Sequence, residues 1–284
     1  MRVSVSALLT RLAVLVAVAS CGVSLCATRA FAQGQGEDIP RLVSFGGSCL
    51  NCTLTGRKLI GARFMGANFS GSVLVGCDLR GALFFGSDFA RADLTRSDLR
   101  GATLTGANFS QSNFTDANLA GVQAQGVTFL GANLTRADLD SVELTGVSLN
   151  QVDARDARFD DSQLLGVSFG GGRFERASFR GANLAGAVLA GGSFAGADFH
   201  GANLIHAILR GADLSAVRGL TQAQVDMACT DAATRLPPGL EAKGCHGLSA
   251  RVIILHSNVA PKPPAPPVPA LTAPRYAYSL GATP

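Results

Sequence analysis

The 284-residue sequence is poor in aromatic and charged residues. It has no Trp, two Tyr and three Met, and charged residues make up only 15%, against about a quarter in an average globular protein. Beyond the N-terminal region, no apolar stretch approaches the ~20 residues that a membrane-spanning helix needs. The formal net charge of +4 is too small to indicate nucleic-acid binding.

The sequence also lacks the motifs of common catalytic and cofactor sites. No Gly-rich dinucleotide-binding or phosphate-binding motif follows an expected strand, and the four His residues form no H-E-x-x-H pair. His200 and His206 fall at outward positions of the repeat described below, where a solvated imidazole is expected. The sequence therefore predicts no enzyme activity, no cofactor and no metal site.

Residues 1–32 are predicted to be an export signal. Arg2 and Arg11 precede an apolar run over residues 12–18. Ala30-Phe31-Ala32 then offers small residues for cleavage before Gln33. A short positive region, an apolar core and an A-x-A site are typical of secreted proteins. We therefore expect a periplasmic or secreted protein.

A second processing route competes with the first. Residues 18–21, Val-Ala-Ser-Cys, resemble the lipoprotein box of bacteria, in which Cys21 becomes the lipidated first residue. The alternative localisation is thus a lipoprotein anchored to the membrane, and membrane contact is expected only if Cys21 is lipidated.

A five-residue period runs through the middle of the chain. Of the 33 positions taken every fifth residue from Leu54 to Leu214, 31 are Leu or Phe, and the exceptions are Ala124 and Ala154. The position two before each centre is nearly always small, and the position two after it is most often Gly. A period of five fits neither an α-helix nor a flat strand.

A chain that turns a corner every five residues explains this pattern. Four such units close a coil of about 20 residues, and stacked coils lie about 4.8 Å apart, as neighbouring strands do. The Leu and Phe centres would fill the axis, and the polar residues would point outward. At Ala124 and Ala154 we expect Val122, Val127 and Val152 to compensate for the smaller centres, or the coil to narrow.

Units such as Ala67-Asn68-Phe69-Ser70-Gly71 and Ala202-Asn203-Leu204-Ile205-His206 carry a family resemblance. They resemble the pentapeptide-repeat family, written A-(D/N)-L-x-x, over residues 54–214. The resemblance implies an all-β fold, a right-handed quadrilateral parallel β-helix.

Both ends of the repeat are expected to be capped, because open ladder edges invite aggregation. Residues 33–53 form the N-terminal cap, with a short strand over 39–45. Residues 215–246 form the C-terminal cap, with a helix over 221–229 that Thr221 begins as N-cap, and this segment resembles the C-terminal end of exported pentapeptide-repeat proteins. Residues 247–284 are a Pro-rich tail that we expect to be flexible.

The cysteines point to disulfides if the chain is exported. The solenoid keeps the N-terminal and C-terminal cysteines too far apart to bridge, so Cys229 and Cys245 are expected to pair. Cys49 and Cys52 can pair with each other, which leaves Cys77 in an inward slot. A redox site or half of a metal site at Cys49 and Cys52 stays an alternative, although no second CxxC motif follows.

Two non-catalytic functions compete. The first is a structural or protein-interaction scaffold in the cell envelope, which binds an unknown protein partner through one face, or itself through that face or the cap helix. The apolar outward residues that mark this face are Met65, Leu83, Phe85, Leu165 and Ile205. The second is DNA mimicry, by which some members of the family protect topoisomerases. The export signal and the near-neutral repeat region, with 14 Lys and Arg against 15 Asp and Glu, oppose the second reading.

Overall fold

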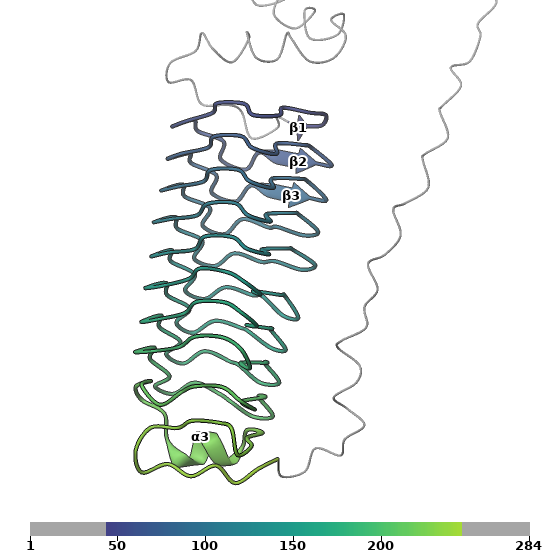
Figure 1. Cartoon of the computed structure of the whole chain (residues 1–284). Helices are drawn as coiled ribbons and strands as arrows, with labels where there is room; N and C mark the ends of the chain where they lie inside the picture. The colour runs from purple at the N-terminus through teal and green to yellow at the C-terminus, as the bar shows by residue number, and fades with distance from the viewer. Residues whose placement is uncertain (1–43, 246–284) are drawn as a thin grey trace, which may run out of the picture. The chain divides into compact units, whose positions relative to one another are not determined.

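The computed structural model describes residues 44–245, which form a solenoid of stacked coils closed by a short helix (Figure 1). Its named elements are β1 (Ser44–Phe45), β2 (Arg63–Met65), β3 (Leu83–Phe85) and α3 (Gln222–Asp226). The three strands form one parallel sheet in the order β1-β2-β3. The predicted export signal, most of the expected strand over 39–45 and the Pro-rich tail lie outside the described residues.

Backbone hydrogen bonds join each coil to the next in a constant register. Bridges link residues 20 apart, as in Asn68 with Asp88 and Asp88 with Asn108. Between coils, the Leu74 amide donates to the Asp93 carbonyl at 2.7 Å, and further bonds repeat at every unit. The expected all-β solenoid with a 20-residue coil is therefore confirmed. Each coil is the hydrogen-bond partner of its neighbours, so the backbone is satisfied along the stack.

The A-(D/N)-L-x-x pattern has a local cause. At the position before each centre, the side chain of Asn or Asp accepts from the amide two residues later, as Asn68 does from Ser70 at 3.0 Å and Asp88 from Ala90 at 3.0 Å. Such turns compete with helix and regular strand. They favour the bend after the centres that Asn or Asp precedes, and short strands or isolated bridges alternate with corners along the chain.

The corner residue two after each centre from Leu54 to Leu209 has a left-handed backbone. Gly occupies most of these positions, as at Gly66 with φ of 60°, because it has no Cβ to clash. Five successive corners in one column instead carry charged residues at φ between 56° and 60°. They are Arg96, Asp116, Arg136, Asp156 and Arg176.

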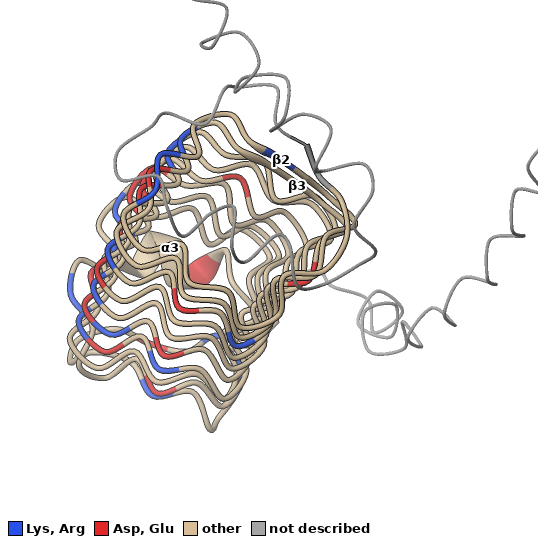
Figure 2. Cartoon of the chain, turned by 90° about the horizontal axis from the view of Figure 1, so that it is seen from above, with Lys and Arg blue, Asp and Glu red and all other residues tan. Residues whose placement is uncertain are grey.

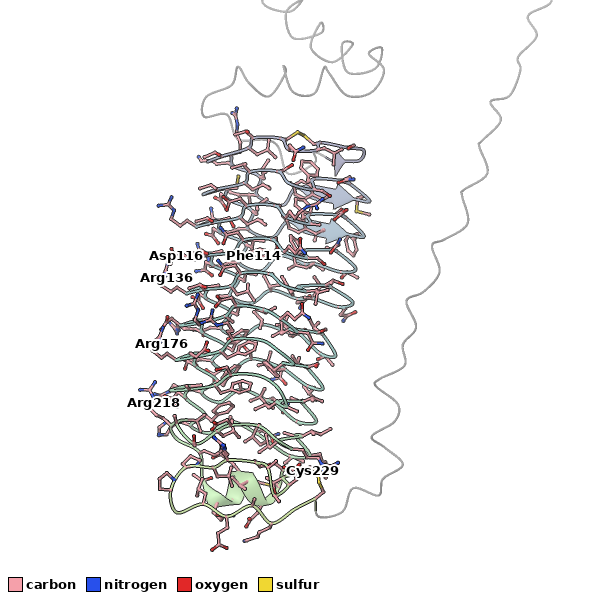
Figure 3. The ribbon with its side chains drawn as sticks, in the orientation of Figure 1. Phe114, Asp116, Arg136, Arg176, Arg218 and Cys229 are labelled. Carbon is pink, nitrogen blue, oxygen red and sulfur yellow. A yellow bond between two sulfur atoms is a disulfide. The ribbon has the colours of Figure 1, made fainter. Side chains whose placement is uncertain are left out.

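The Leu and Phe centres form a continuous buried core. Phe114, labelled in Figure 3, is among the fully buried rings. Rings one coil apart stack, as Phe64 and Phe84 do with centroids 4.8 Å apart, and rings on adjacent sides of a coil meet edge to face, as Phe84 and Phe89 do at 5.1 Å. Both are favourable aromatic geometries, so phenylalanine adds specific ring contacts to the hydrophobic burial.

At a few units, an unusually small centre or slot is accompanied by a larger residue at the other of these two positions. Ala124 and Ala154, the two small centres, follow Val122 and Val152, and all four are buried. The reverse pairing occurs where Phe174 follows Gly172. A Cβ placed on Gly172 would lie 2.5 Å from the ring of Phe174. The small centres are thus accompanied by larger slot residues, as expected.

The chain leaves the solenoid through helix α3. Thr221 is its N-cap and forms a capping box with Gln224. The buried Gln224 amide donates to the carbonyls of Phe199 at 2.9 Å and Ala202 at 2.8 Å. The helix ends at Asp226, shorter than the expected 221–229, because residue 229 returns to the ladder and bridges Ile208.

Four cysteines pair within the described residues. Cys49 is bonded to Cys52 and Cys229 to Cys245, with Cα atoms 5.5 Å and 4.2 Å apart. Cys77 is unpaired and buried, its thiol donates to the Leu54 carbonyl at 2.9 Å, and burial raises its pKa to about 11. Because the reactive form is the thiolate, this thiol is held in an inert state.

The close contact between Gly172 and Phe174 predicts that one substitution has opposite effects on stability in two backgrounds. Gly172→Val should destabilise the wild-type chain by about 1–3 kcal/mol, because the added side chain overlaps the ring of Phe174. In a Phe174→Ala background, the same change should stabilise, because valine fills part of the cavity. Urea unfolding measures both. A destabilising effect of equal size in the two backgrounds would contradict the pairing.

Candidate interaction surface

Outward side chains form columns, because each coil stacks on the residues 20 positions away. Two surfaces made of such columns differ most. The β2 face comprises residues 63–65 and their equivalents every 20 residues up to 203–205. The charged face comprises residues 58–60 and their equivalents up to 198–200. Viewed along the stack, Lys, Arg, Asp and Glu gather mainly on the side away from β2 and β3 (Figure 2).

Ion pairs cover the charged face. Arg80 donates to both oxygens of Asp78, at 2.8 and 2.7 Å, and Arg100 binds Asp98 in the same way at 2.9 and 2.6 Å. Arg80 also lies 3.7 Å from Asp98, which joins the two pairs across neighbouring coils. The arginines offset the carboxylates, so this face is densely charged without a large net charge.

The charged corner column continues this pattern along one edge of the solenoid (Figure 3). The sign of the side-chain charge alternates along this column from Arg96 to Arg176, with one charged residue per coil. Arg136 donates to Asp116 at 2.6 and 2.9 Å, and Arg176 donates to Asp156 at 2.6 Å through two nitrogens. Bidentate pairing of this kind is the strong form of an Arg–carboxylate contact.

These ion pairs lower the pKa values of their carboxylates. The Arg136 guanidinium lowers the pKa of Asp116, and Arg176 lowers the pKa of Asp156. On the charged face, Asp140 behaves differently, because burial and the nearby Asp138 raise its pKa. The charged side is therefore dominated by carboxylates that arginines hold in the ionised form.

The β2 face has a different composition. Its charged outward residues are Arg63 and Glu143 alone. The other outward residues are apolar, amide or hydroxyl side chains, or alanine. They are Met65, Leu83, Phe85, Thr103, Thr105, Gln123, Gln125, Thr145, Gln163, Leu165, Asn183, Ala185, Asn203 and Ile205.

Large apolar side chains are exposed on this face. Met65 is 48% exposed, Phe85 37% and Ile205 39%, while Leu83 and Leu165 are half-buried. Met65 and Phe85 are register partners on β2 and β3. Water therefore contacts apolar surface at both ends of one column, with a polar, uncharged stretch between them.

Glycine columns border the β2 face on both sides. The corners before it are Gly except at Ser141 and Asp161, and the corners after it are Gly except at His206. No Cβ placed on Gly66, Gly86 or Gly126 would meet another atom within 4 Å. A flat partner surface can thus approach the sheet and meet corner side chains only at Ser141, Asp161 and His206, unlike at the charged corner column.

The structure brings four predicted interface residues into one column, Met65, Phe85, Leu165 and Ile205, and Leu83 lies in the column beside it. Sequence reasoning missed the exposed side chains of Leu50, Leu130 and Met227. Of these, Leu130 lies on the adjacent segment 128–130, across the corner Gly126. It also missed the separation of charged from uncharged columns, which writing the sequence in rows of 20 would have made visible.

The structure also bears on metal-binding groups, on His200 and on membrane-spanning helices. Residues 44–245 contain no group of three or more His, Cys, Asp or Glu placed to hold a metal ion. The imidazole Nδ1 of exposed His200 lies 2.5 Å from Asp198 Oδ1, so that ring has a protein partner as well as solvent. Within the same residues, no helix has the length and apolar character required to cross a membrane.

Two family models match the chain. One, described as "Pentapeptide repeats", matches residues 48–84 and 177–215 in eight copies, and the other, "Pentapeptide repeat region", matches 92–169. Together they cover more than half of the chain. No curated protein matches significantly.

Solved structures with this repeat are also similar. HetL, a pentapeptide repeat protein involved in heterocyst differentiation regulation in the cyanobacterium Nostoc, is 32% identical over 62% of this chain and 82% of its own, with a TM-score of 0.37. A pentapeptide repeat protein from the thylakoid lumen of Arabidopsis thaliana is 32% identical over 45% of this chain and 77% of its own, at 0.22. QnrB1, a plasmid-mediated fluoroquinolone resistance protein, is 20% identical over 66% of this chain and 92% of its own, with a TM-score of 0.41.

The charged corner column predicts an acid-dependent part of the stability. Because Asp116 and Asp156 have lowered pKa values in the folded chain, their ion pairs stabilise it above the ordinary Asp pKa of about 3.9. That contribution is lost as pH falls through the lower folded value. Arg136→Gly with Arg176→Gly removes the pairs and keeps a residue suited to the left-handed corner.

Urea midpoints measured between about pH 6 and about pH 2 test this expectation. The wild-type midpoint should fall more steeply than that of the double glycine variant, by a small amount because the pairs are exposed. Parallel curves for the two proteins would show that the ion pairs contribute nothing.

Proposed function

Because the chain belongs to the pentapeptide repeat family, we propose that it is a non-enzymatic protein-interaction scaffold whose contact surface is the β2 face. One observation carries this proposal. The β2 face, whose charged outward residues are Arg63 and Glu143 alone, is also the face on which Met65, Phe85 and Ile205 are exposed. Depletion of charge and enrichment in Phe and Met are typical of the centre of a protein–protein interface.

The remaining surface supports the same assignment. Ion pairs such as Arg80 with Asp78 already satisfy the charged face, so a partner there would have to replace contacts that exist. The β2 face offers apolar groups whose removal from water is favourable. An interface on that face therefore gains free energy without breaking an ion-pair network.

We further propose the finer architecture that the family resemblance implies. The solenoid is a right-handed, four-sided β-helix, and α3 with the Cys229–Cys245 pair closes its C-terminal end. The capping box of α3 and the Gln224 contacts to the last coil support the closing role. The scaffold acts outside the cytoplasm, as a periplasmic or secreted protein or as a lipoprotein anchored to the membrane, and residues 1–32 are the support for this.

DNA mimicry is the weaker candidate. A DNA-like surface requires a strong excess of negative charge along the rod. Residues 54–214 have 14 Lys and Arg against 15 Asp and Glu, and arginines pair with the carboxylates, as Arg136 does with Asp116. The balance of charge therefore favours a protein scaffold.

Affinity capture tests the scaffold. The full chain, tagged at its C-terminus, is purified from the envelope fraction as wild type, as Phe85→Asp with Met65→Asp, and as Arg80→Ala with Arg100→Ala on the charged face. Companion proteins should be lost with the first variant and retained with the second. Mass spectrometry of the captured chain should find Gln33 or lipidated Cys21 as its first residue.

Two results would contradict the proposal. A set of companions that is unaffected by the β2-face variant would exclude that face as the contact surface. A captured chain that still begins at Met1 would exclude both cleavage before Gln33 and lipidation of Cys21.

A further inference from the structure

We propose that the β2 face binds a second copy of this chain, in an antiparallel dimer whose two solenoids lie face to face. This inference rests on the proposed function, because it names the partner of the same surface. It depends on three observations: where the apolar residues lie along the face, where its two charges lie, and how much area the face offers.

The apolar residues lie at both ends of the face. Met65, Leu83 and Phe85 occupy its first two coils, and Leu165 and Ile205 lie toward its last coil. A two-fold interface must be complementary to itself, since the same patch meets its own copy. A face with apolar groups at both ends satisfies this condition when one solenoid is reversed.

The coil register specifies which residues would meet. A two-fold axis that runs between the copies, parallel to the strands, reverses the stack and leaves each column facing its own copy. With all eight outward positions from 65 to 205 overlapping, position numbers that face each other sum to about 270. The resulting pairs are Met65 with Ile205, Phe85 with Ala185, Thr105 with Leu165, and Gln125 with Thr145.

The two charges of the face fit this arrangement. In the neighbouring column, reversal places Arg63 opposite Asn203 and Glu143 opposite Gln123. Each charge then faces an amide that can hydrogen-bond to it, and neither faces a like charge. An unpaired or repelled charge in an interface would be costly, so the pattern is compatible with self-association.

A parallel arrangement fits less well. An axis along the stack would place column 65 against column 63 of the same coil. Phe85 would then face Leu83, which is a favourable apolar pair. At the other apolar positions, however, Ile205 would face Asn203, Leu165 would face Gln163 and Met65 would face Arg63. Apolar groups would be buried against polar ones, and desolvating those polar groups costs free energy.

The available area indicates a reversible dimer. Eight coils span about 35 Å, and one face with its glycine corners is about 15 Å wide. Two copies would thus bury about 1,000 Å² in total, near the lower limit for a specific interface. The glycine columns allow the two sheets to approach to the ~10 Å spacing of packed sheets. We expect a dissociation constant on the order of 10 µM.

Sedimentation velocity of the full purified chain from about 1 µM to about 500 µM tests the dimer. Met65→Lys and Ile205→Glu should each raise the dissociation constant at least about tenfold. The double variant Met65→Lys with Ile205→Glu should regain most of the loss, because reversal places lysine opposite glutamate. Leu130→Lys, at an exposed apolar residue of the adjacent segment, is the matched control and should change nothing.

Far-UV circular dichroism of every variant should equal that of the wild type, since all these side chains point outward. A chain that stays monomeric over the whole range would overturn the dimer. The dimer would also be overturned if the double variant dimerised no more tightly than the single variants, or if Leu130→Lys weakened dimerisation as much as Met65→Lys. The two proposals can fail separately. If the chain is monomeric but the Phe85→Asp with Met65→Asp variant still loses its captured companion proteins, only the dimer is overturned. If the chain dimerises but captures no other protein that depends on the β2 face, only the binding of other partners is overturned.

Discussion

The rest of the structure depends on the hydrogen-bond ladder between successive coils. Between the two end coils it holds residues beside those 20 positions later, so whatever the sequence repeats at that interval becomes a column. Inside, the columns are stacked Leu and Phe; outside, they are ion pairs on one side and uncharged residues on another. Stability accumulates from contacts between neighbouring coils rather than from one central core.

The inward half of the fold follows directly from the sequence. Leu or Phe at a fixed interval, with small slots, predicts the solenoid and its coil length because few other structures bury a five-residue period. The shorter α3 was not predictable, since Met227 and Ala228 suit a helix locally. Cys229 leaves it only because a partner, Ile208, is available in the ladder. Tertiary contacts decided that boundary.

The candidate surface was only half predictable. Phe85 and Met65 stand out in a sequence as apolar residues at polar positions, yet Leu130 stands out equally and lies on the adjacent segment. What distinguishes Phe85 is its setting between two corner columns that are almost all glycine, whereas the corners beyond Leu130 include Arg91, Gln111 and Gln151. That setting exists only after the coils are stacked, and it is the physical reason to assign an interface to the β2 face rather than to the ion-paired charged face.

The 20-residue register can be tested by comparing two deletions in one urea-unfolding experiment. Removing residues 92–111 takes out one coil and joins Arg91 to Ser112 in register. Removing residues 92–110 shifts all later centres by one position. We predict a cooperative transition near the wild-type midpoint for the first deletion and loss of that transition for the second. Equal stability of the two deletions would contradict the register and every column built on it.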